Sequence, residues 1–309
     1  MKQNRKFTKA LFLDRLSTEE TVIAIDRSPE NSEYNRRHQV LKYRLIASDL
    51  DGTLLDDQKR ISDRAKAAIS EYQRRGGIFT IATGRKEESA RKFVEMIHVS
   101  APIVAFNGAK IVDFSKNEVL QESFLDTSIA ISAYTALRAI GKDIVVYTDG
   151  KPLISGNTPN IGRYMDRIEI SMKVIEDVSE LCGRLITKIL VIDPRQEQGG
   201  MVKLIEPIFG EYLNAISSDD EFLELLPPGV SKGRALTALA DTLGISMAET
   251  IAIGDHLNDI SMIQAAGLGV AVENAREETR QAADYITMDN NHDGVALIIE
   301  KALAGSAVL

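Results

Sequence analysis

Two aspartates, two residues apart, follow the first strongly apolar run of the chain. The run 43–48 (YRLIAS) leads into Asp49 and Asp51, and Gly52 and Thr53 come next. An ionised carboxylate can attack an electrophile, transfer a proton or bind a hard cation. The segment therefore predicts a strand that ends in a turn with carboxylate chemistry.

Polar residues also follow two other predicted strands. They are Thr83 and Gly84 after TIA, and Asp255, Asn258 and Asp259 after IAIG. Taken singly, each residue is about as well explained by a structural role, in a turn or as an N-cap, as by a functional one. Taken together, they are not explained by structural roles. Ligands bind where the carboxyl ends of parallel strands meet, and carboxylates that converge there without a cation repel one another. A divalent cation with oxygen ligands resolves this repulsion, and we expect Mg²⁺.

The elements that must position these groups alternate between strands and helices. Residues 62–76 predict a helix with Ser62 as its N-cap, and strands are predicted on either side of it, at 43–48 and 77–85. A helix at 86–97 and a strand at 101–109 follow, and the same alternation returns over 232–303. This order predicts an α/β fold, a Rossmann-like parallel sheet with helices on both faces.

The middle of the chain has a different pattern. Its predicted elements are helices at 126–141 and 198–210 and strands at 143–149, 185–193, 211–218 and 222–227. The last two strands are short neighbours that read as an antiparallel pair. We therefore expect a core domain formed by residues 41–123 and 230–309, and an inserted α+β cap domain at residues 124–229.

Residues 1–40 differ from the rest of the chain. They are polar and turn-prone, whereas the alternation of strands and helices begins only at Tyr43. Two interpretations stay open. The segment is either a mobile N-terminal extension or an artefact of the assigned start, since a leucine codon at Leu41 could serve as a bacterial initiator.

Composition and charge argue against several classes of partner. The chain has 309 residues, a net charge of −8 and no basic stripe, so we expect neither nucleic acid nor a membrane as a partner. The only cysteine, Cys182, cannot form an intramolecular disulfide and fits a reducing compartment. No apolar run approaches the roughly 20 residues of a membrane span, and ALFL is too short for a signal-peptide core. These features predict a cytoplasmic protein. The oligomeric state, a monomer or a small homo-oligomer, stays open.

Four motifs occur in a characteristic order: DLDGT at 49–53, ATGR at 82–85, GVSKG at 229–233 and GDHLNDISM at 254–262. In this order and spacing the chain resembles the haloacid dehalogenase-like (HAD) phosphatases over residues 43–303. The long insert, with FNGA before it and AADYIT near the end, is similar to the Cof-type branch with a type IIB cap. The resemblance implies a HAD core with an inserted cap.

The resemblance also implies a role for each matching residue. Asp49 is expected to attack phosphorus and form an aspartyl-phosphate, and Asp51 to act first as general acid and then as general base. Asp49, the backbone carbonyl of Asp51 and Asp255 are the expected Mg²⁺ ligands. Asp259 is expected to support them, with direct ligation as the alternative.

The other motif residues are expected to hold the transferring phosphoryl group. Thr83 would donate its hydroxyl, and the backbone N–H groups of Leu50 and Gly84 would bind the oxygens. Lys232 would neutralise the aspartyl and phosphate charges together, whereas a lone lysine would be read as a solvated surface residue. Asn258 is expected to reach the phosphate as well.

Three further residues are less determined by their motifs. Arg85 either contacts the substrate or cap or forms a structural ion pair, and Asn107 either binds substrate or shapes the turn into the cap. His256 is not expected to bind metal, since none of the other histidines pairs with it.

The predicted function is a Mg²⁺-dependent phosphatase for small phosphomonoesters, such as sugar phosphates or phosphorylated cofactors. Two alternatives remain. A phosphomutase could use the same residues, and a binding or regulatory protein could keep the fold without turnover. The second alternative usually involves loss of an essential carboxylate or lysine, and all of these are present here.

Overall fold

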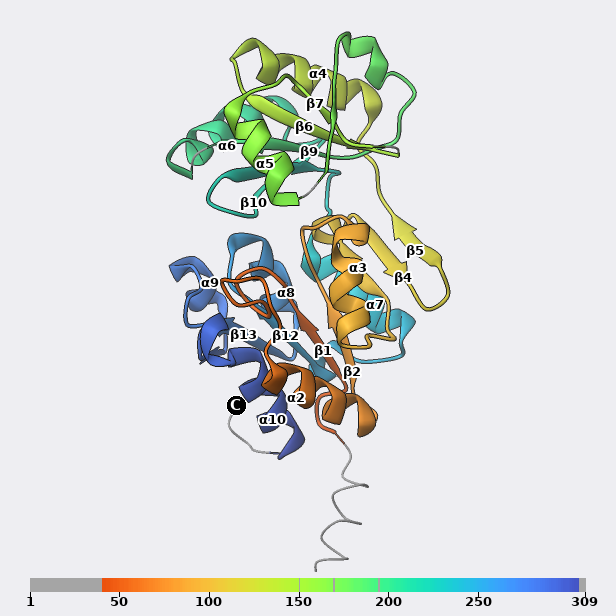
Figure 1. Ribbon diagram of the computed structural model, residues 1–309, viewed down its shortest axis with the longest axis vertical. Coiled ribbons are helices and arrows are strands. Elements are labelled where there is room, and N and C mark those ends of the chain that lie inside the picture. Colours follow the sequence, from red (N-terminus) through yellow and green to blue (C-terminus); the bar gives the residue numbers. More distant parts are fainter. Residues whose placement is uncertain (1–40, 150, 169, 194, 306–309) are drawn as a thin grey trace, which may run out of the picture. The chain divides into compact units, whose positions relative to one another are not determined.

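The structure, a computed structural model, describes residues 41–149, 151–168, 170–193 and 195–305 (Figure 1). The predicted N-terminal extension, residues 1–40, lies outside the described residues. Within the described ranges, no helix combines the length and the hydrophobicity that crossing a bilayer requires.

The first sheet is parallel throughout and has the strand order β14-β13-β12-β1-β2. Strands β13, β12, β1 and β2 are labelled in Figure 1. Its strands are β1 (Leu45–Ser48), β2 (Ile78–Ile81), β12 (Thr250–Gly254), β13 (Leu268–Val272) and β14 (Tyr285–Thr287). Strand β1 pairs with β2 on one side and with β12 on the other, with Ser48 opposite Ile81 and Ile253. The polar groups that follow these three strands therefore meet at one edge, as the predicted parallel sheet requires.

Helices cover both faces of this sheet, which confirms the predicted fold class. One face packs on α2 (Asp63–Arg74), α3 (Glu87–Met96) and α10 (Gly294–Leu303), and the other on α7 (Lys232–Thr242) and α8 (Ile260–Ala265). Side chains of β1 alternate between the two layers, because successive strand residues point to opposite faces. Helix α9 (Glu277–Ala282) packs against β13 and α8.

The third predicted core strand forms but leaves the parallel sheet almost at once. Strand β3 (Ile103–Ala105) touches the sheet through one parallel bridge, between Ala82 and Val104. It continues into an antiparallel meander with β4 (Lys110–Asp113) and β5 (Glu118–Glu122), which the sequence pattern did not predict. The reason is local, since Phe106, Asn107 and Gly108 have φ values of 50°, 54° and 101°, and three left-handed residues in succession turn the chain back.

A second sheet, of mixed direction, lies between residues 143 and 226 and has the order β10-β11-β9-β6-β7-β8. Its strands are β6 (Asp143–Thr148), β7 (Leu153–Ile154), β8 (Lys173–Val174), β9 (Ile186–Ile192), β10 (Asn214–Ser217) and β11 (Phe222–Leu226). The predicted pair β10–β11 is antiparallel, as expected. The two-residue strands β7 and β8 were not predicted, because so short a run carries no periodicity.

The two faces of this second sheet have different partners. One face packs on α4 (Thr127–Ala139) and α6 (Arg195–Phe209). The other carries Tyr147 and Leu190, which cluster with α5 (Pro159–Ile168) and with Phe106 from the first half of the chain. The two faces of the second sheet therefore pack against different parts of the chain. The predicted domain boundaries stay predictions.

Candidate active site

Asp49 and Lys232 form the buried centre of the site. Asp49 follows β1 directly, and its backbone N–H donates to the carbonyl of Ile253 at 2.9 Å. Lys232, the first residue of α7, has no exposed surface, and its Nζ lies 2.7 Å from Asp49 Oδ1 and 2.6 Å from Asp259 Oδ1. Ser231 caps this helix by accepting from the backbone N–H of Arg234. The helix start thus fixes the lysine between two carboxylates, and the alternative of a solvated surface lysine is wrong.

Asp255 follows β12 and points toward the same place. The hydroxyl of Thr53 donates to its Oδ1 at 2.7 Å. Gly52 has a φ of +79°, and a Cβ at this position would lie 2.5 Å from Asp255 Oδ2. Glycine is therefore required between Asp51 and Thr53 for two reasons, the backbone conformation and the close approach of the carboxylate.

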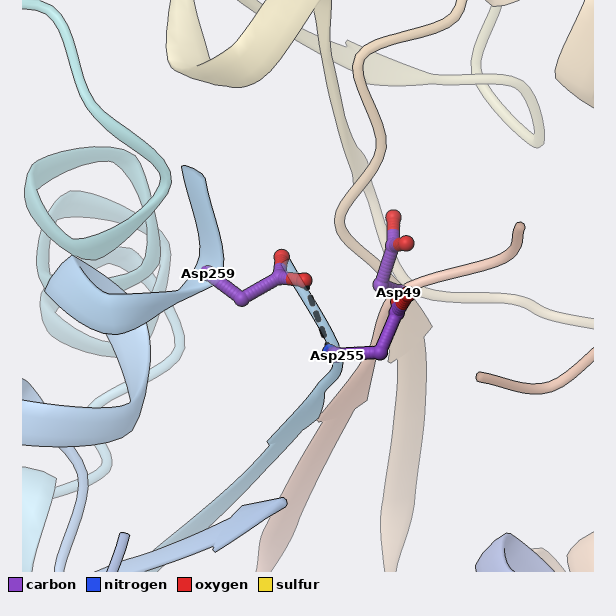
Figure 2. A group of neighbouring side chains, drawn as sticks. All are labelled: Asp49, Asp255 and Asp259. Carbon is purple, nitrogen blue, oxygen red and sulfur yellow. Dashed lines mark hydrogen bonds between the residues drawn. The ribbon is translucent and has the colours of Figure 1, made fainter. Parts of the chain in front are cut away.

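The carboxylates of Asp49, Asp255 and Asp259 form one cluster, in which oxygen atoms lie within 4.8 Å of one another (Figure 2). Three carboxylates are a donor set for a hard divalent cation, and their convergence fits the metal that the sequence predicts. Asp259 differs from the other two, because its Oδ2 accepts from the backbone N–H groups of Asp255 and His256, both at 3.0 Å, and its Oδ1 binds Lys232. Its contacts favour a supporting role over direct ligation.

The negative charges of the three aspartates repel one another unless a cation is bound. Burial and the nearby carboxylate of Asp259 raise the pKa of Asp49 to about 7, although Lys232 acts in the opposite direction. Burial and the carboxylates of Asp259 and Asp49 raise the pKa of Asp255 well above its usual value. Burial would lower the pKa of Lys232, but Asp259 and Asp49 outweigh it and raise that pKa. The ammonium is thus charged, and it offsets only part of the carboxylate repulsion.

Asp51 has the opposite environment. Arg85 binds it with two hydrogen bonds, of 2.6 and 2.7 Å, and Lys59 Nζ lies 2.9 Å from its Oδ1. Burial alone would raise the pKa of Asp51, but Arg85 and Lys59 hold it well below the usual value. Of the two predicted roles for Arg85, the structure shows the ion pair. The two aspartates of the first motif therefore have pKa values shifted in opposite directions, although only one residue separates them.

The predicted phosphate-binding turn lies beside these residues. Thr83 is buried, and its hydroxyl accepts from the backbone N–H of Arg85 at 3.2 Å. The carbonyl of Gly84 accepts from Lys188 Nζ of β9 at 3.0 Å. The carbonyl of Leu50 accepts from the N–H of Leu55 at 2.9 Å, which closes the turn after β1. Strands β1 and β2 thus place Leu50, Thr83 and Gly84 at the same sheet edge as Asp49.

Asn258 and Asn107 join a chain of hydrogen bonds that leads into the second sheet. Asn258 Nδ2 donates to Asn107 Oδ1, and Asn107 Nδ2 donates to Glu224 Oε2 of β11, both at 2.8 Å. His256, which was not expected to bind metal, lies with its Nδ1 3.2 Å from the carbonyl oxygen of Ser217. Asn107 thus contacts the second sheet directly as well as shaping the turn before it.

A cavity of about 1240 Å³ extends over this site, and both sheets contribute to its lining. Asp49, Asp51, Thr83, Asp255 and Asn258 all line it. It exceeds the usual size of a small-molecule pocket, so it has room for a phosphoryl group and an organic group together. Four residues of the site were not assigned a role from sequence: Thr53, Lys59, Lys188 and Glu224. Thr53 belongs to the first motif and could have been found there, whereas the others carry no local signal.

Comparison with known proteins gives concordant matches. A family model described as haloacid dehalogenase-like hydrolase matches residues 46–299. The 5-amino-6-(5-phospho-D-ribitylamino)uracil phosphatase YcsE of Bacillus subtilis is 31% identical over 256 residues, which cover 83% of this chain and 94% of that protein.

Solved structures agree with the sequence matches. A haloacid dehalogenase-like hydrolase from Bacteroides thetaiotaomicron superposes with a TM-score of 0.74 at 29% identity, covering 84% of this chain and 99% of its own. The subclass IIB sugar phosphatase BT4131 superposes with a TM-score of 0.75 over 83% of this chain and 98% of its own. Its 20% identity supports the shared fold alone.

Proposed function

Because this chain belongs to the haloacid dehalogenase-like hydrolase family and is a phosphoric monoester hydrolase, we propose that it hydrolyses small phosphomonoesters through an aspartyl-phosphate, with Mg²⁺ as cofactor. The observation that carries the proposal is the buried contact between Asp49 and Lys232 at the end of β1. A nucleophilic carboxylate needs a fixed position and a nearby positive charge, and this contact supplies both.

In the first step Asp49 attacks phosphorus, and the bond between phosphorus and the leaving oxygen breaks. The ammonium of Lys232 lies beside the attacking carboxylate and offsets the negative charge that gathers there. Thr83 and the backbone N–H groups of Leu50 and Gly84 bind phosphoryl oxygens. Asp51 gives its proton to the departing oxygen.

In the second step water attacks phosphorus, and the bond between phosphorus and the Asp49 oxygen breaks to release inorganic phosphate. Asp51, now ionised, takes the proton from this water. The ion pair that Asp51 makes with Arg85 and Lys59 suits this second role, because it stabilises the ionised carboxylate. For the first role Asp51 must hold a proton, so the substrate has to weaken the contacts that Arg85 and Lys59 make with it.

The carboxylates fit a bound Mg²⁺. Asp49, Asp255 and the backbone carbonyl of Asp51 would hold it, while Asp259 positions the Asp255 backbone and Lys232. When bound, Mg²⁺ would neutralise charge on the phosphoryl oxygens.

Residues 124–229 are proposed to act as a cap that reads the organic part of the substrate, because the second sheet contributes Tyr147, Lys188 and Glu224 to the cavity lining. Sugar phosphates and phosphorylated cofactors are the proposed classes. The name of the relative YcsE, which specifies a phosphate on a ribityl group, supports a sugar-like substrate. A cytoplasmic location stays a prediction.

The test is phosphate release from a panel of phosphomonoesters, with Mg²⁺ and with EDTA. Wild type is compared with Asp49→Asn and with Asp63→Asn, a control whose carboxylate is fully exposed at the start of α2. We expect metal-dependent release in wild type and in the control, and none in Asp49→Asn. Conversion of a sugar phosphate into its positional isomer without release of phosphate, and only in the presence of a sugar bisphosphate, would favour a phosphomutase. Tight binding of a phosphate ester with neither reaction would favour a binding protein.

A further inference from the structure

Two asparagines that follow β13 and β14 bind the turn that carries Asp51. Asn274 comes shortly after β13, and its Nδ2 donates to the carbonyl of Gly52 at 2.8 Å. Asn290 follows β14, and its Nδ2 donates to the carbonyl of Leu55 at 3.0 Å. Neither asparagine belongs to the four motifs or takes part in the mechanism proposed above. The carboxyl ends of all five strands of the first sheet therefore contribute polar groups to the same edge.

The orientation of the Asn274 amide is determined by its two partners. The carbonyl of Gly52 can only accept a hydrogen bond, and the backbone N–H of Asn290 can only donate one. Asn274 must therefore turn its Nδ2 toward Gly52 and its Oδ1 toward Asn290, whose backbone nitrogen lies 3.0 Å from that oxygen. The side chain thus links the turn after β1 to the segment after β14.

The bond from Asn274 restrains a peptide that glycine leaves free to rotate. Gly52 has a φ of +79°, and glycine limits its own φ and ψ less than any other residue. Among the described residues, no other donor bonds the carbonyl oxygen of Gly52. Asn274 therefore orients the peptide between Gly52 and Thr53, and the hydroxyl of Thr53 in turn donates to Asp255.

The turn that contains Asn274 also holds the segment after β12. The backbone N–H of Arg276 donates to the carbonyl of Asp255 at 2.8 Å. The turn is closed by the N–H of Ala275, which donates to the carbonyl of Val272 at 3.0 Å. One turn therefore binds the backbone of both segments that are proposed to carry metal ligands.

These bonds have more effect on a bound metal than on the stability of the fold. Asn274 is exposed and lines the cavity, and an exposed hydrogen bond adds little to the free energy of unfolding, since water competes for both partners. A metal ion binds tightly only when its ligands are held in place, and the groups that orient those ligands change metal affinity about 10- to 100-fold.

We propose that Asn274 and Asn290 are positioning residues for the metal site. They hold the turn 51–55 so that the backbone carbonyl of Asp51 and the carboxylate of Asp255 converge on the cation. This inference rests on the proposed function and deepens it, because it extends the metal site to two residues that ligate nothing themselves.

The test measures Mg²⁺ binding itself, by isothermal titration of the metal-free protein and by the rise of Tm with Mg²⁺ concentration. Asn274→Ala removes the bond to Gly52, and Asn290→Ala removes the bond to Leu55 but keeps the backbone N–H. Asn291→Ala is the matched control, because Asn291 lies in the same segment as Asn290 but bonds Asp57, which is outside the turn 51–55.

We expect Asn274→Ala and Asn290→Ala each to raise the Kd for Mg²⁺ about 10-fold, and Asn291→Ala to change it less than about 2-fold. In EDTA all three variants should lose no more than about 4 °C in Tm, so that a loss of stability does not explain the loss of affinity.

A Kd of Asn274→Ala within about 2-fold of the wild-type value would overturn the positioning role. An equal loss of affinity in Asn291→Ala would do the same, because it would show a general effect of the segment. Phosphate release by the wild type from p-nitrophenyl phosphate is measured separately. Its absence would refute the proposed function while Mg²⁺ binding still tests the positioning role, whereas a wild type that binds no Mg²⁺ would overturn the positioning role together with the proposed cofactor.

Discussion

Asp255→Asn should make the metal-free protein more stable while removing its response to Mg²⁺. Asp255 Oδ1 accepts a hydrogen bond from Thr53, and the amide oxygen of asparagine can accept the same bond. The substitution therefore removes charge from the cluster of Asp49, Asp255 and Asp259 with little change in shape.

The magnitude follows from the distances. The carboxylate oxygens lie at most 4.8 Å apart, and two unit charges at that separation repel by about 3 kcal/mol at an effective dielectric constant of 20. Asp255 is repelled by the carboxylates of Asp49 and Asp259 and attracted by the ammonium of Lys232, so the net effect is about one such repulsion. Allowing for relaxation, we expect the free energy of unfolding in EDTA to rise by about 1 to 3 kcal/mol, and Tm by about 2 to 10 °C.

The size of this stabilisation also depends on pH. The pKa of Asp255 is raised in the folded state. The charge of Asp255 therefore does not destabilise the wild type below the pKa of the unfolded state, near 4, and it destabilises the fold increasingly as pH rises above that value. The advantage of Asp255→Asn should thus be small at pH 4.5 and largest at pH 8. With Mg²⁺ at 100 times its Kd the wild type gains about 2.7 kcal/mol, and the variant should gain much less.

The assay is thermal unfolding followed by circular dichroism, in EDTA and in Mg²⁺, at both pH values. Asp51→Asn is the matched control with the opposite expected sign, since Asp51 is satisfied by Arg85 and Lys59. Its loss should be about 1 kcal/mol, because the pair is partly exposed. A lower Tm of Asp255→Asn in EDTA, or an undiminished shift with Mg²⁺, would refute the reasoning.

Three further outcomes are expected. Gly108→Ala should lower the free energy of unfolding in urea by at least about 3 kcal/mol, because Gly108 has a φ of +101° and a Cβ there would lie 2.3 Å from the carbonyl oxygen of Ser231. Gly141→Ala, at a φ of +76° with open space around it, should cost only about 1 kcal/mol, and equal costs would contradict the packing argument. Lys232→Met should lower phosphate release by at least about 100-fold and stability by about 3 to 5 kcal/mol, since it leaves two buried carboxylates without their cation; a variant as stable as wild type in a calorimeter would show that the pair is dispensable. Arg74 and Arg75 lower the pKa of Glu71 to about 2, so wild type should exceed Glu71→Gln by about 0.5 kcal/mol at pH 7, with a difference that shrinks as pH falls from 5 to 3 in chemical unfolding; a gap that widens in acid would reverse the assigned sign.

The parts of the site that the sequence could predict are those fixed by short-range patterns. Asp49 and Asp255 each follow a buried strand, and the parallel pairing of β1 with β12 brings them together. Lys232 could be recognised because it begins a capped amphipathic helix within a motif. In these cases the local pattern and the sheet topology together determine the contact.

The parts that could not be predicted depend on contacts between distant segments. Lys188 meets Gly84, and Glu224 meets Asn107, across more than 100 residues, and nothing near either residue indicates its partner. The antiparallel continuation of β3 into β4 and β5 was missed for a different reason. All residues of β5 are exposed, so no alternation of apolar and polar side chains marks it as a strand.

The pairing of β1 with β12 also bears on how the chain is made. Leu45 pairs with Thr250, so β1 must wait for about 200 further residues before its partner is synthesised. At bacterial and eukaryotic elongation rates this takes on the order of 10 to 40 s. The segment with the second sheet is complete before then, so it can fold on the ribosome while one edge of β1 remains open. We therefore expect nascent chains that stop before β12 to depend on chaperones, because an unpaired apolar strand is a site of aggregation.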